Sequence, residues 1–498
     1  MVSQEIIDKG LLMAKQTFFW HDYETFGLDP RTDQAAQFAG VRTDLDFNII
    51  GEPVNVYCQP ATDCLPHPES CLITGITPQM AMQNGICEAE FIRLIDQELA
   101  QPQTCTLGYN NLRFDDEVTR NLLYRNFYDP YAREWQNGNS RWDLIDVVRA
   151  TRALRPDGIE WPINEEGVAS FRLEALTEAN AIAHQDAHEA LSDVYATIAI
   201  AKCIKQAQPR LYDFFFQHRI KTKALELLQL GAMKPLVHVS GKYPASKHCL
   251  AVVLPIVQHP TNANGIIVYD LTVDPEPLLD LSAEQIQQRV FTATADLPEG
   301  VERIPLKTVH INKCPILAPL SALRKQDAER LEIDVERCFK HLEKIKGVDS
   351  MQQKLGEVFA SPSYTEESDP DLMIYSGGFF NHADRVVMAQ IRNTEADDLS
   401  ILNPDFKDSR LPEMLFRYRA RNFPETLNDK ENQQWQIFCR NKLLVDQEAA
   451  DRIDIAEYWK LLEEMKARPN VNMTVVDALA EYAKGKMDEF SITEQDFN

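Results

Sequence analysis

Residues 18–27, FFWHDYETFG, decide the fold of this chain. Four bulky residues predict a buried strand, and they lead directly into Asp22, Tyr23 and Glu24. Residues two apart on a strand point to the same face, so we expect Asp22 and Glu24 to converge while Tyr23 faces away. Neighbouring carboxylates repel each other unless a cation or a proton lies between them. Either the strand ends in solvent, or a positive group belongs beside the two acids.

Length, charge and cysteine usage limit the classes of protein. The chain has 498 residues, which favours two to four domains, and a net charge of −25. Phosphate binding depends on Lys and Arg, so a nucleic-acid enzyme of this charge needs its cations clustered locally. The ten cysteines form no CxxC pair, which is typical of reduced thiols in a cytoplasmic protein. We expect neither a signal peptide nor a membrane-spanning segment.

The pattern divides the chain into an N-terminal extension (1–16), an α/β segment (17–208), a β-rich segment (209–359) and a helical segment (360–498). Strands and amphipathic helices alternate in the second of these, which predicts a mixed-sheet α/β fold with helices on both faces. Apolar runs separated by turn residues in the third favour a small barrel. The expected strands of the α/β segment cover 17–25, 36–44, 52–60 and 104–111, and its expected helices cover 76–85, 88–99, 114–127, 141–154, 170–182 and 187–206.

Three further residues complete a possible catalytic group. Asp115 lies at the start of an expected helix in FDDE, and His188 precedes Asp193 by five residues in HEALSD. Four acids can hold two Mg²⁺ or Mn²⁺ ions about 4 Å apart for phosphodiester hydrolysis, and a histidine can take the proton of the attacking water. Each motif alone has a structural explanation, since acids also favour helix N-termini. Their order along the chain favours the catalytic interpretation.

The motifs HDYETFG, LGYNNLRFDDEVTRNLLYRNFYDPYA, SRWDLIDVVRA and SFRLEALTEAN carry a resemblance. They resemble the DEDDh branch of the DEDD 3′–5′ exonucleases and, within it, the bacterial exonuclease I family. MKPLVHVSG, VHINKCP and YRARNFPETL extend this resemblance over nearly the whole chain. It implies a ribonuclease H-like exonuclease domain, an SH3-like β-barrel and a C-terminal helical domain that together form a channel for one strand. The resemblance implies five catalytic residues: Asp22, Glu24, Asp115, His188 and Asp193. All of these except His188 are implied metal ligands.

A single strand needs cations for its phosphates and aromatic faces for its bases. Residues 115–155 interleave seven arginines with tyrosines and tryptophans, although Tyr124, Phe127 and Trp142 are equally compatible with a core. Together with Glu24, the residues that we expect to contact the strand are Arg120, Tyr131, Trp135, Arg149, Arg172 and Lys221. Arg172 has an alternative role, in an ion pair with Glu174 or Glu178. Three more cations are candidates for the acidic tail of single-stranded DNA-binding protein, a partner that the resemblance implies: Arg155, Lys234 and Arg324.

The resemblance implies a single-strand-specific 3′–5′ exodeoxyribonuclease that releases 5′-mononucleotides in DNA repair and recombination. We expect two Mg²⁺ ions, for which Mn²⁺ could substitute, single-stranded DNA as partner, and a monomer. Two alternatives stay open: an RNA-trimming exonuclease of the same superfamily, and a non-catalytic scaffold that binds single strands. The first differs in how the pocket treats the 2′-hydroxyl, and the second should have lost ligands.

Overall fold

The computed structural model describes residues 15–184, 188–348, 350–360, 367–444 and 453–496. Most of the expected N-terminal extension therefore lies outside the described residues. The chain forms two compact units. The first contains residues 1–140, 185–195 and 365–498, and the second contains residues 141–184 and 196–364. Among the described residues, no helix is long and apolar enough to cross a bilayer.

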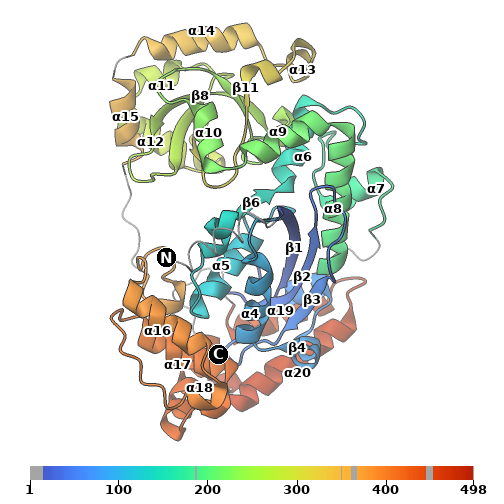
Figure 1. Ribbon diagram of the computed structural model, residues 1–498, viewed down its shortest axis with the longest axis vertical. Coiled ribbons are helices and arrows are strands. Elements are labelled where there is room, and N and C mark those ends of the chain that lie inside the picture. The colour runs from blue at the N-terminus through green and yellow to red at the C-terminus, as the bar shows by residue number, and fades with distance from the viewer. Residues whose placement is uncertain (1–14, 185–187, 349, 361–366, 445–452, 497–498) are drawn as a thin grey trace. The chain divides into compact units, whose positions relative to one another are not determined.

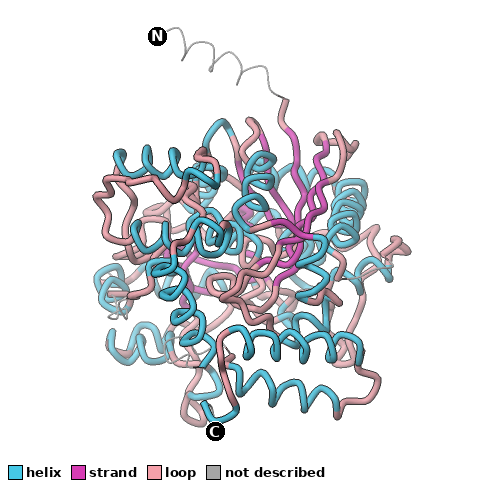
Figure 2. Tube along the Cα trace, turned by 90° about the horizontal axis from the view of Figure 1, so that it is seen from below, coloured by secondary structure: helices cyan, strands magenta, loops and turns pink. Residues whose placement is uncertain are grey.

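A six-stranded mixed sheet organises the first unit (Figure 2, in which the strands of both sheets of the molecule are magenta). Its order is β4-β3-β2-β1-β5-β6, with β1 antiparallel to β2 and parallel to β5. The mixed-sheet fold predicted from the sequence is therefore confirmed. The strands are β1 (Thr17–Thr25), β2 (Ala35–Thr43), β3 (Val54–Cys58), β4 (Gly85–Ile86), β5 (Thr104–Gly108) and β6 (Ser140–Asp143), whose last three residues belong to the second unit.

Strand β1 is buried on both faces because it lies inside the sheet. Phe19 and Tyr23 point into one core, where Tyr23 meets Phe38 edge-on with ring centroids 4.8 Å apart. On the other face Trp20 is fully buried and donates a hydrogen bond of 2.9 Å to the Thr43 hydroxyl. This packing fixes the register, since a slip of one residue would move every side chain to the opposite face.

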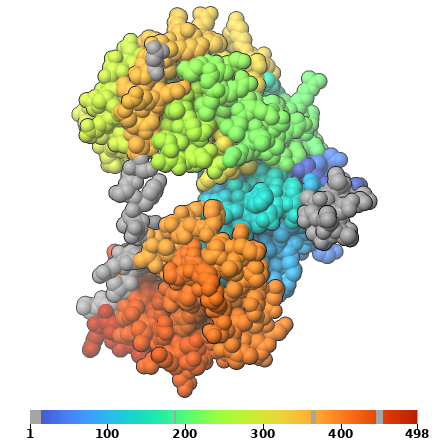
Figure 3. Space-filling view, turned by 60° about the vertical axis from the view of Figure 1, so that its left-hand side comes forward, coloured from blue at the N-terminus to red at the C-terminus, as the bar shows by residue number. Residues whose placement is uncertain are grey.

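Helices of the N-terminal and C-terminal segments pack together in the first unit (Figures 1 and 3). α4 buries Phe91, Ile92, Ile95 and Leu99 at helical spacing, as its pattern predicts. α17 packs against α4, while α20 packs against α2 and α3, so the helical segment shares a core with the six-stranded sheet. The helices are α2 (Pro68–Thr74), α3 (Pro78–Asn84), α4 (Glu88–Leu99), α5 (Asp115–Arg125), α16 (His382–Arg392), α17 (Leu411–Asn422), α18 (Asp429–Leu444), α19 (Ile455–Lys466) and α20 (Met473–Glu489).

The second unit contains an antiparallel five-stranded sheet of order β10-β9-β8-β7-β11. Its strands are β7 (Leu236–Val239), β8 (Leu250–Gln258), β9 (Gly265–Asp270), β10 (Leu306–His310) and β11 (Ile316–Pro319). The segment predicted as β-rich also holds many helices. The helices of this unit are α6 (Leu144–Leu154), α7 (Leu173–Ala179), α9 (Pro209–His218), α10 (Lys221–Leu228), α11 (Glu276–Asp280), α12 (Ala283–Phe291), α13 (Lys325–Arg330), α14 (Val335–Lys346) and α15 (Met351–Val358). α8 (Ala190–Ala207) begins in the first unit and continues into the second.

Several expected helices are shorter in the structure than the sequence predicts, among them those expected over 76–85 and 114–127, which became α3 and α5. The helix expected over 141–154 begins only at Leu144, because Asp143 ends β6 and caps α6 through the Ile145 amide at 3.1 Å. Trp142 is fully buried against Tyr212, which supports its interpretation as a core residue. The helix expected over 170–182 is limited to α7.

Candidate active site

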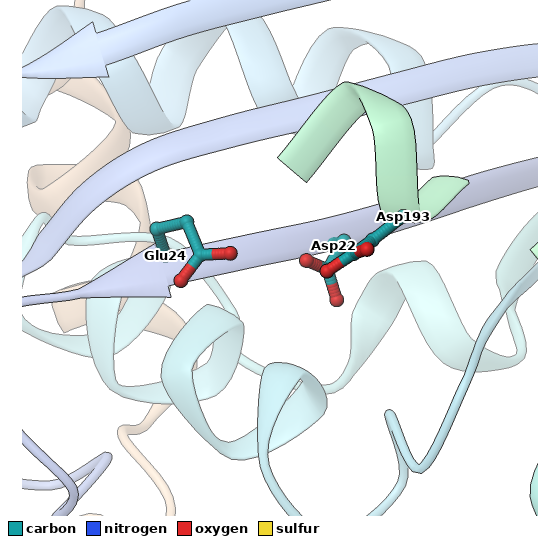
Figure 4. A group of neighbouring side chains, drawn as sticks. All are labelled: Asp22, Glu24 and Asp193. Atoms are coloured by element: carbon teal, nitrogen blue, oxygen red, sulfur yellow. The ribbon is translucent and has the colours of Figure 1, made fainter. Parts of the chain in front are cut away.

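Three carboxylates meet at the end of β1. Asp22 and Glu24 lie along that strand, and Asp193 reaches them from the first turn of α8 (Figure 4). One oxygen atom from each residue lies within 4.8 Å of those of the other two. Carboxylate oxygens are the ligands that Mg²⁺ and Mn²⁺ prefer, so this donor set fits a divalent-metal site.

Asp115 is held against the backbone of β1 between the two acids of that strand. It is the first residue of α5, and its Oδ1 accepts a hydrogen bond of 3.0 Å from the Tyr23 amide. The Thr119 hydroxyl, one turn later, lies 3.1 Å from the Tyr23 hydroxyl. Tyr23 thus ties α5 to the strand through both its backbone and its side chain, which places the Asp115 charge beside the other carboxylates.

Burial and mutual repulsion make this group of acids costly to ionise. Burial and then the charges of Asp115, Glu24 and Asp193 raise the pKa of Asp22 well above its ordinary value. Burial and then the charge of Asp193 raise the pKa of Glu24 to about 8. Without a cation, Glu24 therefore holds a proton at neutral pH, and Asp22 is harder to ionise than an ordinary aspartate. A bound cation would favour the ionised forms of both side chains.

His188 lies immediately before α8 in a segment that is fastened to the sheet. It is half-buried and has a left-handed backbone with φ of 69°. The next residue, Glu189, accepts hydrogen bonds from the side chains of Gln37 at 3.0 Å and Asn55 at 3.3 Å. Its second oxygen accepts from the Ser192 amide at 2.8 Å. Glu189 therefore caps α8 and holds the histidine segment on β2 and β3.

Glu189 is a feature of the site that sequence reasoning did not identify as functional. Its charge also raises the pKa of Asp22 and Glu24. The available signal was the spacing of Glu189 and Ser192, which is typical of a helix N-terminus. The partners Gln37 and Asn55 are more than 130 residues away and could not be inferred from that spacing.

Two of the predicted strand contacts in the first unit, Arg120 and Tyr131, lie against each other. The Arg120 guanidinium lies 5.4 Å from the ring centroid of Tyr131. It also bonds to Glu117 and Glu134, each at 2.7 Å, so its charge is balanced. Trp135 is 66% exposed, which leaves its ring accessible to a ligand.

The seven arginines between residues 120 and 155 do not form one exposed basic surface, contrary to the sequence interpretation. Arg125 is buried in an ion pair with Glu88 at 2.6 Å. Arg133 and Asp116 form another at 2.8 Å, and both side chains are fully buried. These two guanidinium groups pair with buried carboxylates in the interior, so they do not contribute to an exposed basic surface. Tyr124 and Phe127 are also buried, as core residues would be.

Three predicted strand contacts lie in the second unit. Arg149 bonds to Asp146 at 2.6 Å, and its guanidinium fills the space where a side chain at Gly241 would lie. Arg172 is 77% exposed, with its guanidinium 3.6 Å from Glu174, so the predicted ion pair is a surface one. Lys221 is exposed and donates to the Asn264 side chain at 2.6 Å.

The predicted partner-binding cations Arg155 and Arg324 converge on Asp327, at 3.1 and 2.6 Å. Arg330 lies 3.7 Å from the same carboxylate, so three guanidinium groups surround one acid. Burial and repulsion by Arg324 lower the pKa of Arg155. Lys234 is exposed. The guanidinium groups around Asp327 therefore outnumber the carboxylate that they share.

The chain matches three protein-family profiles along its length. They are the exonuclease family over residues 19–201, the exonuclease I SH3-like domain over 219–361 and the exonuclease I C-terminal domain over 368–486. Exodeoxyribonuclease I of Escherichia coli K12 is 48% identical over 469 residues, which cover 91% of this chain and 98% of the relative. The chain belongs to the exodeoxyribonuclease I family. The Haemophilus influenzae exodeoxyribonuclease I is also 48% identical, over 86% of this chain and 90% of its own length.

Solved exonuclease I structures share this fold. That of Methylocaldum szegediense has 53% identity and a TM-score of 0.91, covering 95% of this chain and all of its own. E. coli exonuclease I with a dA16 oligonucleotide has 46% identity and a TM-score of 0.90, with the same coverage. A zinc-bound complex of the E. coli enzyme with single-stranded DNA matches equally well. The family and the three-part fold predicted from the sequence are therefore confirmed.

Proposed function

We propose that this chain degrades single-stranded DNA from its 3′ end by metal-dependent hydrolysis, releasing 5′-mononucleotides. The observation that carries the proposal is the convergence of the Asp22, Glu24 and Asp193 oxygens within 4.8 Å. Membership of the exodeoxyribonuclease I family supports the substrate and direction, and the E. coli relative has been solved with oligonucleotides. DNA repair and recombination are the proposed cellular use.

The donor set fits two divalent cations, and we propose Mg²⁺ with Mn²⁺ as a substitute. Asp22, Glu24 and Asp193 would hold them directly, and Asp115 would complete the set. Bound cations would supply Lewis-acid activation of water and charge stabilisation at the phosphodiester. The zinc-bound form of the E. coli relative supports divalent-metal binding.

In this proposal His188 is the general base and accepts a proton from the attacking water at a ring nitrogen. The contacts of Glu189 with Gln37 and Asn55 fix the segment that carries it. Glu24 also faces the terminal nucleotide. Arg120, Tyr131, Trp135, Arg149, Arg172 and Lys221 contact the rest of the strand; the exposure of Trp135 and Arg172 supports this assignment.

We further propose that Arg155 and Arg324, with Lys234, bind the acidic tail of single-stranded DNA-binding protein. The excess of guanidinium groups around Asp327 supports an anionic partner. A monomer is the proposed state, because one chain carries every carboxylate of the site. None of the ten cysteines, all of which lie among the described residues, forms a disulfide, and this supports a reducing compartment such as the cytoplasm.

The test uses 5′-labelled single-stranded DNA, the matching RNA and a blunt duplex, each with Mg²⁺ or EDTA. The proposal predicts shortening of the DNA single strand alone, from its 3′ end and only with metal. Asp22→Asn should stop cleavage while the strand still binds. Trimming of RNA alone would transfer the chemistry to the alternative substrate. Binding without cleavage by the wild-type protein would favour the scaffold, which the complete set of acids now disfavours.

A further inference from the structure

The first turn of α5 is not fixed by a side-chain cap. Its N-cap residue is Phe114, whose side chain has no atom that could accept a hydrogen bond from the helix. Asp115 and Asp116 are the first two helical residues, and consecutive side chains of a helix point about 100° apart. Asp115 is held against the Tyr23 amide, so Asp116 points in a different direction. The position of Asp115 therefore depends on what the rest of the fold does to this turn.

Arg133 makes one of the contacts that hold the first turn of α5. Its guanidinium donates to the Asp116 carboxylate at 2.8 Å, and both side chains are fully buried. A second nitrogen of the guanidinium lies 3.5 Å from the hydroxyl of Thr106. Thr106 belongs to β5 and lies opposite Phe19 of β1, the strand that carries two acids of the site. Arg133 therefore connects the start of α5 to the interior of the sheet.

The turn that carries Arg133 is itself attached to α5. This turn, η1 (Ala132–Glu134), is a short 3₁₀ helix. Glu134 accepts two hydrogen bonds from the Arg120 guanidinium, at 2.7 and 3.0 Å. Asp116 and Arg120 stand at positions i and i+4 of α5, so they lie on the same face of that helix. η1 thus pairs with one acid and one base on the first two turns of α5, which limits the movement of these turns.

The opposite end of α5 offers a comparison. There Arg125 pairs with Glu88 at 2.6 Å, and this pair is buried as well. At 1.5 Å per residue it lies about 14 Å along the helix from Asp116, far from the first turn. A buried ion pair contributes little net stability, because desolvation offsets the attraction between the two charges. The Asp116–Arg133 pair differs from the Glu88–Arg125 pair in its place, directly beside a candidate metal ligand.

We propose that Arg133 is a positioning residue for the metal site. Through Asp116 it fixes the first turn of α5 and so holds the Asp115 carboxylate beside the acids of β1. The inference rests on the proposed function, in which Asp115 completes the set of metal ligands. Loss of the ion pair should move Asp115 away from the Tyr23 amide and weaken the binding of a divalent metal.

The first experiment removes the ion pair without changing the net charge. Asp116→Asn combined with Arg133→Met deletes one charge of each sign. Glu88→Gln combined with Arg125→Met does the same at the far end of α5 and is the matched control. Titration calorimetry measures the binding of Mn²⁺ to the full chain without DNA. The first double variant should bind Mn²⁺ about 10- to 100-fold more weakly than wild type, whereas the control should bind it as wild type does.

Two milder changes at the same position keep the test independent of a folding defect. Arg133→Lys preserves a charge pair and should retain most of the Mn²⁺ affinity. Asp116→Asn combined with Arg133→Gln can keep one hydrogen bond between the two side chains, so its loss of affinity should be intermediate. Thermal unfolding shows which variants are folded, and only folded variants enter the comparison.

The second experiment reads the position of Asp115 in the absence of metal. Hydrogen exchange of the Tyr23 amide is followed in EDTA, on the fragment that contains it. The double variant at Asp116 and Arg133 should exchange this amide faster than wild type, because Asp115 no longer accepts its hydrogen bond. The control at Glu88 and Arg125 should exchange it at the wild-type rate.

The outcomes separate this inference from the proposed function. Unchanged Mn²⁺ affinity in the folded variants at Asp116 and Arg133 would overturn the inference and leave the proposed function intact. Weaker binding at an unchanged Tyr23 exchange rate would also overturn it, since Asp115 would not have moved. Equal losses in both double variants would do the same, because the effect would then reflect stability alone. A wild-type protein that neither binds Mn²⁺ nor shortens single-stranded DNA would overturn both.

Discussion

Raising the pH should destabilise the metal-free protein through its buried carboxylates, and Mg²⁺ should reverse the effect. Glu24 has a pKa raised from 4.5 to about 8, by burial and then by the charge of Asp193. Between these values the folded protein keeps a proton that the unfolded chain releases. The folded state then binds more protons, so the free energy of unfolding decreases as the pH rises through this range.

The size of the effect follows from the two pKa values. The interval from 4.5 to about 8, at 1.36 kcal/mol per pH unit, gives at most about 5 kcal/mol for Glu24. Asp22 acts in the same direction, because its pKa is also raised. The loss begins near the unfolded value and is complete above about pH 8. Divalent metal binds the ionised carboxylates, so added Mg²⁺ should restore stability most strongly at high pH.

The assay compares wild type with Glu24→Gln in denaturant unfolding from pH 5 to 8, in EDTA and in excess Mg²⁺. Gln imitates the protonated side chain, so in EDTA the variant should gain stability over wild type progressively as the pH rises. Glu52→Gln, at an exposed position, should show a constant difference and is the control. A constant difference for Glu24→Gln as well, or no stabilisation of wild type by Mg²⁺, would refute the account of the carboxylate cluster.

Three further substitutions test the general base, the contact that positions it and a buried ion pair. His188→Asn should lower single-turnover cleavage by roughly 10²- to 10⁴-fold without weakening strand binding; a loss below tenfold would assign the base elsewhere. Glu189→Ala should lower kcat by about 10- to 10²-fold at unchanged KM, and adding Gln37→Ala should cause little further loss; additive losses would contradict a shared positioning contact. Asp63→Asn removes a fully buried carboxylate that pairs with Arg421 and Lys442. Because Arg421 keeps its ion pair with Asp371, the unfolding free energy should fall by about 3 kcal/mol, at the lower end for a broken buried pair, whereas unchanged stability would contradict the ion pair's role.

Local periodicity was sufficient to predict the elements whose core faces are set by adjacent residues. The strand predicted over 17–25 and the helix predicted over 88–99 have those bounds in the structure. The alternation of side chains along a strand is enough to predict that Asp22 and Glu24 point to the same face, and the structure places Asp193 beside them. The catalytic roles of these residues stay predictions.

Contacts between residues far apart in the chain could not be predicted from the local sequence pattern. Arg125 and Arg133 were interpreted as part of a basic surface, but Glu88 and Asp116 neutralise them in the interior. Glu189 accepts hydrogen bonds from Gln37 on β2 and Asn55 on β3, and these contacts show its role in the site. In each case tertiary packing, which local sequence does not encode, decides what the side chain contacts.

The raised pKa values of Asp22 and Glu24 and the burial of β1 have the same physical origin, the packing of that strand inside the sheet. The strand carries Phe19 and Tyr23 toward one core, while its other face changes from Trp20 to Asp22 and Glu24. A slip of one residue would bury both acids in that core and turn Tyr23 toward the site, so packing fixes the acids rigidly. The same packing removes water from them and raises their pKa values. The packing therefore both fixes the positions of the two carboxylates and makes them harder to ionise. A bound cation would use the fixed positions as ligands and would lower the raised pKa values.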